Sequence, residues 1–209
     1  MKEIDIGYRF KDNKWLLQAF THSSYGNEFN EPSNETLEFL GDSVLGMLVS
    51  DWLFNNQKGT SEGVLSQSRS RINSNIVLSK VGEKFFKHLR LGSSFADKEQ
   101  SETMHAKADL VEAIVGAIWQ DSKDLNECMK FLSTHLDFEK LIETDCDYKT
   151  QLQHLAQKDG GKPPEYKTVQ DGDKFSSRVF IDGKMFGQGS GTKKQQAEMT
   201  AAKQALKRF

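Results

Sequence analysis

Two segments of this chain, residues 34–54 and 106–118, place carboxylates in helices that otherwise look fully buried. Each segment is apolar on nearly every side of a helical projection, which is typical of a core helix. The acidic residues within them are Glu35, Glu38, Asp42, Asp109 and Glu112. A carboxylate taken out of water costs several kcal/mol unless it is paired or bound to a cation. Both segments therefore require a partner for these charges.

The spacing of the acids predicts what that partner is. Glu38 and Asp42 are four residues apart on one helix face with Glu35 on the same side, and Asp109 and Glu112 are three residues apart. If the two helices pack together, four carboxylates converge and their mutual repulsion favours proton uptake. Mg²⁺ or Mn²⁺ removes this conflict, because hard divalent cations prefer oxygen ligands. The sequence thus predicts a divalent metal site.

Simpler explanations exist for any single acid in this set. One carboxylate could cap a helix, pair with Arg69 or Lys107, or be exposed. Two such pairs on separate apolar helices favour the metal site over these alternatives.

His22 lies beside Ser23 and Ser24, which raises the possibility of a nucleophilic serine–histidine pair. No nucleophile elbow or carboxylate motif accompanies it, so we expect a packing or capping role for His22. The other histidines lack metal-ligand spacing.

The chain divides into two regions that differ in composition and in the spacing of their apolar residues. From residue 14 to 138 the only proline is Pro32, and apolar residues recur at helical spacing. The predicted helices are 15–20, 37–54, 75–89, 105–121 and 128–136, with loops at 27–34 and 92–102. We therefore expect an all-α domain over residues 1–143.

Residues 147–209 read as a small α+β domain. A helix at 148–161 ends at a Gly pair, and a helix rich in Ala and Lys closes the chain at 192–209. Between them lie three segments of strand composition, 165–170, 174–183 and 184–189, separated by DGD and DGK turns. The predicted order is α-β-β-β-α.

Composition limits the functional classes. Charged residues make up 28% and aromatic residues 10%, which indicates a folded protein. Cys128 and Cys146 form no CxxC pair, and no signal segment or membrane-length run is present, so we expect a cytoplasmic, reducing location without membrane attachment. The net charge of −2 hides a basic tail, since residues 147–209 hold 12 basic and 7 acidic residues. Such a tail favours a polyanionic partner.

Several motifs together resemble the ribonuclease III family. Residues 34–45, NETLEFLGDSVL, match its acidic signature, and residues 16–25, LLQAFTHSSY, match its upstream segment. The segments 62–75 and 108–121 match its next helix and its second acidic helix, and 147–209 resembles the double-stranded RNA-binding domain that follows the nuclease domain. The resemblance covers nearly the whole chain in the expected order.

This resemblance implies an endoribonuclease that hydrolyses double-stranded RNA with Mg²⁺, leaving 5′-phosphate and 3′-hydroxyl ends. The family's active-site acids match Glu38, Asp42, Asp109 and Glu112, all four forming the metal site. Of these, Glu38, Asp109 and Glu112 correspond to direct ligands, whereas Asp42 and Glu112 correspond to the catalytic residues that position the attacking water. Glu35 matches an accessory acid linked to RNA contact. Whether one or two ions act is left open.

The family also forms symmetric homodimers that supply one site for each RNA strand, and the apolar residues 45–54 would suit such an interface. Ordinary core packing of Met47, Trp52 and Phe54 is the alternative. A non-catalytic double-stranded RNA-binding relative is the main rival function, but it should have lost at least one of the four acids. A metal-dependent hydrolase of small nucleotides is disfavoured by the tail that resembles an RNA-binding domain.

Three surfaces of the tail are implied in RNA binding: the first helix, the loop between the first two strands and the last helix. The residues concerned are Thr150, Gln153, His154, Lys174, Lys193 and Lys194. The loop departs from the family pattern, because Gly172 and Asp173 stand where Gly-Pro-x-His is common. Residues 187–194 lack Walker spacing, so we expect no nucleotide cofactor.

Overall fold

The computed structural model describes residues 4–57, 60–96, 98–143, 148–157 and 161–208. The chain divides into two compact units, Met1–Thr144 and Asp145–Phe209. The boundary predicted between domains 1–143 and 147–209 falls at residues 144–147, outside the described residues. No described helix is both long enough and apolar enough to cross a membrane.

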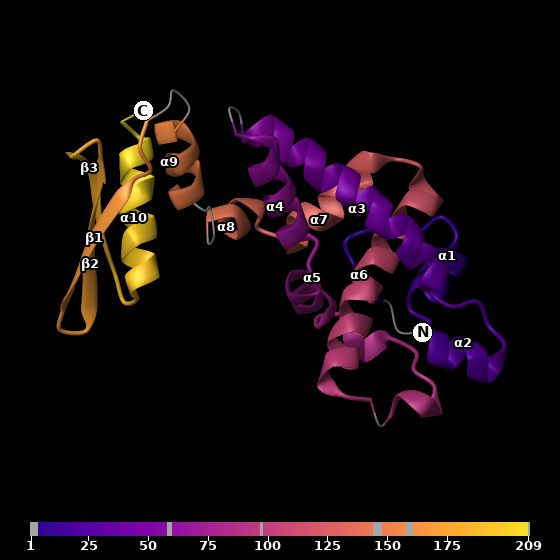
Figure 1. The fold of residues 1–209 in the computed structure, drawn as a ribbon. Coiled ribbons are helices and arrows are strands. Elements are labelled where there is room, and N and C mark those ends of the chain that lie inside the picture. Colours follow the sequence, from indigo (N-terminus) through magenta and orange to yellow (C-terminus); the bar gives the residue numbers. More distant parts are fainter. Residues whose placement is uncertain (1–3, 58–59, 97, 144–147, 158–160, 209) are drawn as a thin grey trace. The chain divides into compact units, whose positions relative to one another are not determined.

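The first unit is helical, as predicted (Figure 1). Its elements are α1 (Asn13–Ala19), α2 (Ser23–Phe29), α3 (Glu35–Asn56), α4 (Glu62–Ile72), α5 (Asn75–Gly82), the 3₁₀ turns Phe86–His88 and Ser93–Phe95, α6 (Gln100–Ser122), α7 (Leu125–His135) and α8 (Phe138–Glu143).

Helix α6 forms the centre of this unit and contacts α1, α3, α5 and α7. Between Leu110 and Ile118 every residue except Glu112 is buried. A helix that is apolar all round must be surrounded by other elements, and α6 is. Glu112 is therefore held within the most enclosed part of the unit.

The helix predicted over residues 75–89 was too long. Helix α5 ends at Gly82, and a short turn leads into the 3₁₀ segment Phe86–His88. A Cβ built on Gly82 would overlap the carbonyl oxygen of Lys107, so glycine permits close packing against α6. Glycine is also a poor helix former, which favours a helix end here. Helices α2 and α8 were not predicted.

The expected capping role of His22 is confirmed. His22 is the N-cap of α2, and its Nδ1 accepts a hydrogen bond of 3.1 Å from the backbone N–H of Ser24. Its ring packs edge-on against Phe95, with centroids 4.8 Å apart. Burial lowers the pKa of His22, so the neutral ring serves as the cap.

We expect His22→Ala to destabilise the protein by about 1 kcal/mol through loss of the cap. Because the folded-state pKa of His22 is lowered, its contribution is fully present above the ordinary value of 6.5 and is lost as pH falls through the lowered pKa. His22→Asn, which retains a capping side chain, should keep most of the stability. Thermal unfolding of the wild type and both variants, at pH values above and below 6.5, measures the contribution of the cap and its pH dependence. Equal stability of His22→Ala and wild type would contradict the capping role.

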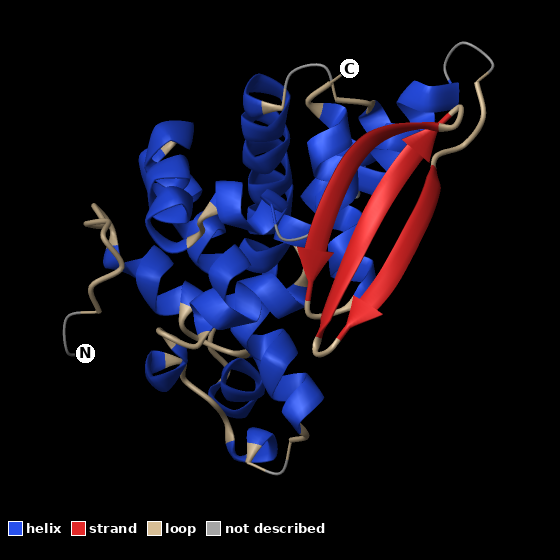
Figure 2. Ribbon diagram, turned by 90° about the vertical axis from the view of Figure 1, so that its left-hand side faces the viewer, coloured by secondary structure: helices blue, strands red, loops and turns tan. Residues whose placement is uncertain are grey.

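The second unit is a three-stranded antiparallel sheet with two helices, in the predicted order (Figure 2). Its elements are α9 (Tyr148–Gln157), β1 (Glu165–Asp171), β2 (Lys174–Ile181), β3 (Lys184–Gly191) and α10 (Lys194–Leu206). Both predicted hairpins are confirmed by the register, which pairs Asp171 with Lys174 and Ile181 with Lys184. Asp182 and Gly183 both have positive φ, which a tight hairpin turn of this kind requires.

Candidate active site

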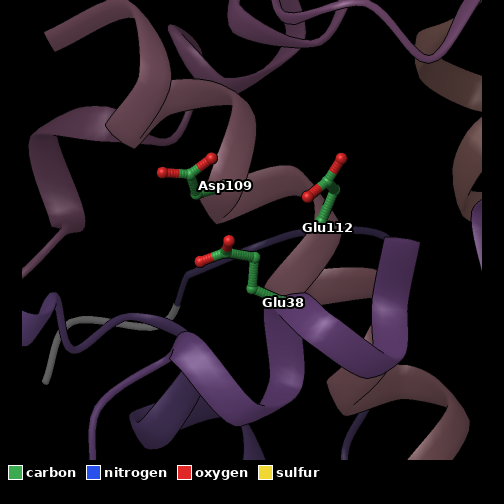
Figure 3. Close-up of side chains that lie close together, drawn as sticks. All are labelled: Glu38, Asp109 and Glu112. Atoms are coloured by element: carbon green, nitrogen blue, oxygen red, sulfur yellow. The ribbon is translucent and has the colours of Figure 1, made fainter. Parts of the chain in front are cut away.

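Helices α3 and α6 bring three of the predicted acids together. Glu38, Asp109 and Glu112 each offer a carboxylate oxygen, and these oxygens lie within 4.8 Å of one another (Figure 3). All three side chains are partly buried. Oxygen donors this close, from two separate helices, could together hold a divalent metal ion.

Two glycines allow the helices to approach this closely. A Cβ on Gly41 would overlap the backbone carbonyl oxygen of Glu112, and a Cβ on Gly116 would overlap that of Leu37. Gly41 and Gly116 therefore put the α3 and α6 backbones in direct contact beside the acids. Gly41, the glycine of the LEFLGD segment, therefore has a structural role: it sets the distance between the acid on α3 and the acids on α6.

Asp42 and Glu35 lie outside this group of three. Asp42 is exposed, although its negative charge acts on both Glu38 and Glu112. Glu35 is exposed in the first turn of α3 and accepts a 2.9 Å hydrogen bond from the Ser33 hydroxyl. The acids predicted as one site thus form an inner group of three with two acids at its edge.

Comparisons with known proteins show which family this chain belongs to. A Ribonuclease-III-like family model matches residues 12–138, and a double-stranded RNA binding motif matches residues 148–208. Ribonuclease 3 of Clostridium beijerinckii is 39% identical, covering 99% of this chain and 94% of the relative. Ribonuclease 3 of Listeria monocytogenes is 38% identical, covering 96% and 93%. This chain belongs to the ribonuclease III family.

The resemblance inferred from the sequence is therefore confirmed. A solved ribonuclease III nuclease domain from Campylobacter jejuni also has a similar fold, with a TM-score of 0.56 and 28% identity over 66% of this chain and 92% of that one. The helical unit is thus a ribonuclease III nuclease fold.

Burial and mutual repulsion dominate the electrostatics of this ribonuclease III site. Burial, followed by the charges of Asp109, Glu35 and Asp42, raises the pKa of Glu38 to about 7. Burial and the neighbouring acids also raise the pKa of Glu112 to about 8. Burial raises the pKa of Asp109 as well. These carboxylates need either protons or a cation.

His105 is a basic neighbour of the acidic cluster, although the sequence showed no metal-ligand spacing around it. It is exposed on α6, one turn before Asp109, and when protonated it opposes the rise in the pKa of Asp109. The available sequence signal was its i,i+4 spacing from Asp109 rather than any metal-ligand pattern.

The predicted RNA-contact residues are spread over the second unit. Gln153 on α9 is exposed and its Nε2 donates to Gln157 Oε1 at 3.3 Å. Lys174 is exposed at the start of β2, and Lys193 and Lys194 are exposed at the beginning of α10. The side chains of Thr150 and His154 lie outside the described residues.

We expect the stability of the metal-free enzyme to fall as pH rises. The folded-state pKa values of Glu38 and Glu112, about 7 and about 8, exceed the ordinary 4.5. Their contribution is therefore fully present below 4.5 and is lost as pH rises through 7 and 8. Mg²⁺ should restore about 1–2 kcal/mol at alkaline pH, discounting for the solvent that reaches the site.

Differential scanning calorimetry with and without Mg²⁺ at about pH 6 and about pH 8.5 measures this linkage. The rise in Tm caused by Mg²⁺ should be larger at the higher pH. A double Glu38→Gln, Glu112→Gln variant provides the control and should lose most of this difference. A Tm that Mg²⁺ leaves unchanged at both pH values would contradict a cation site.

Proposed function

We propose that this ribonuclease III family member is an endoribonuclease that hydrolyses phosphodiester bonds in double-stranded RNA with the help of Mg²⁺, for which Mn²⁺ can substitute. The observation that carries the proposal is the convergence of Glu38, Asp109 and Glu112 within 4.8 Å, in a chain that also has a double-stranded RNA binding motif. A set of carboxylate oxygens with raised pKa values fits a hard divalent ion.

In this proposal Glu38, Asp109 and Glu112 hold the ion. When bound, the ion lowers the pKa of a water molecule and neutralises charge on the reacting phosphate. Asp42 and Glu112 orient the attacking water, and one of the two accepts its proton; their carboxylates are near enough for the charge of Asp42 to raise the pKa of Glu112. The water oxygen bonds to phosphorus while the bond from phosphorus to the 3′ oxygen breaks, and the departing 3′ oxygen takes a proton from solvent, which leaves 5′-phosphate and 3′-hydroxyl ends.

The second unit supplies RNA binding. Gln153 faces a minor groove, whereas Lys193 and Lys194 contact phosphates from the N-terminus of α10. Lys174 contributes from the turn between β1 and β2, whose two central residues are Gly172 and Asp173. Glu35, exposed beside the acidic cluster, contacts RNA near the cut. The roles of Thr150 and His154 stay predictions, as does the cytoplasmic location.

We also propose that the enzyme is a homodimer, and one face of α3 provides the surface. Phe39, Met47 and Phe54 share this face and are 79%, 56% and 73% exposed, so ordinary core packing does not explain Met47 or Phe54. Trp52 does pack internally, with its ring 5.1 Å from that of Phe138. The Campylobacter jejuni nuclease domain likewise has a region involved in dimer formation.

We expect Met47→Glu to convert the dimer to a monomer by placing a charge in the apolar interface. Light scattering after size exclusion measures the mass. Ile76→Glu is the matched control, because Ile76 is 63% exposed but lies on α5, and it should leave the dimer intact. A dimer that survives Met47→Glu would rule out this face of α3.

Incubation of the protein with a long RNA duplex, with and without Mg²⁺, tests the proposed endoribonuclease activity. Metal-dependent fragments carrying 5′-phosphates are expected from the wild type. Duplex that is bound on a gel but stays intact in Mg²⁺ and in Mn²⁺ would instead identify a non-catalytic RNA-binding relative.

A further inference from the structure

Helix α10 contains a buried carboxylate that the proposed reaction does not use. Glu198 is only 8% exposed and stands in an alanine-rich segment whose neighbours Ala197, Ala201 and Ala202 are fully buried. An ionised carboxylate in such a position requires a partner. Its side chain accepts hydrogen bonds from Lys149 Nζ at 2.7 Å and from the Thr168 hydroxyl at 3.1 Å.

These contacts join elements from both ends of the second unit. Lys149 belongs to the first turn of α9, Thr168 to β1 and Glu198 to α10. The buried Ser177 hydroxyl on β2 lies 2.9 Å from that of Thr168, and Lys149 Nζ lies 4.7 Å from the centre of the Tyr166 ring. The network therefore fixes α9, α10 and two strands to one another.

Glu198 is ionised in this network. Burial alone would raise its pKa, but the hydrogen bonds from Lys149 and Thr168 hold the pKa below its usual range. A partly buried ion pair gains little net stability over a well-packed apolar pair, because both charges lose water. The more specific consequence of such a pair is that it fixes the positions of the two helices that carry the charges.

We infer that Glu198 is a positioning residue for RNA binding, which sets the spacing of α9 and α10 through its ion pair with Lys149. This inference rests on the proposed function, in which α9 presents Gln153 and α10 presents Lys193 and Lys194 to the same duplex. Minor-groove and phosphate contacts must match the fixed period of A-form RNA. A change in helix spacing therefore weakens both sets of contacts together.

The sign of one substitution separates positioning from simple electrostatics. Glu198→Gln removes a negative charge close to Lys194, so an electrostatic effect alone would strengthen binding to RNA. If Glu198 acts by positioning, the same variant weakens binding, because the amide holds the Lys149 ammonium poorly. Glu198→Asp keeps the charge but shortens the side chain. If Glu198 acts by positioning, this variant also weakens RNA binding. If only its charge matters, the affinity for RNA stays nearly unchanged.

The experiment measures the affinity of the full-length protein for a fluorescent RNA duplex of about 20 base pairs, longer than one such domain spans. Metal is omitted so that the duplex stays intact. Glu165→Gln is the matched control, since Glu165 is exposed on β1 and its charge change is the same. Thermal unfolding of each variant confirms that it is folded at the assay temperature.

We expect about fivefold weaker binding for Glu198→Gln, a smaller loss for Glu198→Asp, and wild-type affinity for Glu165→Gln. Affinity of Glu198→Gln equal to or tighter than wild type would overturn the inference. If Glu198→Gln fails to fold, Glu198→Asp replaces it in the test, and an affinity of Glu198→Asp equal to or tighter than wild type would overturn the inference. Failure of the wild type itself to bind duplex RNA would instead refute the proposed function.

Discussion

Glu112→Gln is expected to abolish metal-dependent cleavage of duplex RNA, with kcat/KM falling about a thousandfold, or ~4 kcal/mol of transition-state stabilisation. The amide has nearly the same shape as the carboxylate, but it carries no charge for the ion and cannot accept a proton from the attacking water. Glu112 is also held among buried residues of α6, so no other side chain can replace it readily.

The single-turnover rate should fall while metal-free RNA affinity stays equal or rises, because a negative charge near the phosphate backbone is removed. Glu139→Gln, at an exposed position on α8, is the control and should cleave like the wild type. Glu112→Gln should also be more stable than the wild type without metal at alkaline pH, because it relieves the repulsion at the cluster. Cleavage by Glu112→Gln at the wild-type rate would place the reaction elsewhere.

Gly41→Ala should have the second largest effect on activity, although Gly41 has no side chain that could take part in the reaction. The added methyl group would overlap the carbonyl oxygen of Glu112, which is backbone and cannot rotate away. Overpacking of this kind costs about 1–3 kcal/mol. The strain is relieved only if α3 and α6 separate, which draws Glu38 away from Asp109 and Glu112. A misplacement near 1 Å can cost about a hundredfold in rate, so we expect at least that loss of activity.

Chemical denaturation and the single-turnover rate measure both consequences of Gly41→Ala. Gly63→Ala is the matched control: Gly63 lies in helix α4, and a Cβ there would meet no atom within 4 Å. That variant should be active and as stable as the wild type or slightly more so, because Ala favours a helix over Gly. If Gly41→Ala is as active as Gly63→Ala, the contact between α3 and α6 does not set the site geometry.

The sequence by itself determined the class of each unit and the type of side chain at the candidate site. Carboxylates at i,i+3 and i,i+4 in two apolar helices indicated a cation, because a buried charge needs a partner whatever the fold. The same argument, applied to Glu198 in its alanine-rich helix, would have predicted a buried partner for that acid also. The turns at 171–174 and 181–184 followed from local backbone preferences, which depend on few neighbours.

Only the tertiary structure decided which acids meet and which apolar residues are exposed. Helical periodicity gives the face on which Glu38 and Asp42 lie, but only the packing of α3 against α6 shows that Glu38, and not Asp42, belongs to the inner group. Likewise the sequence cannot tell that Trp52 packs on Phe138 while Met47 and Phe54 lie exposed on the surface of the single chain, since all are apolar. Side-chain chemistry is a property of each residue, whereas distances between helices arise from packing among segments far apart in the chain.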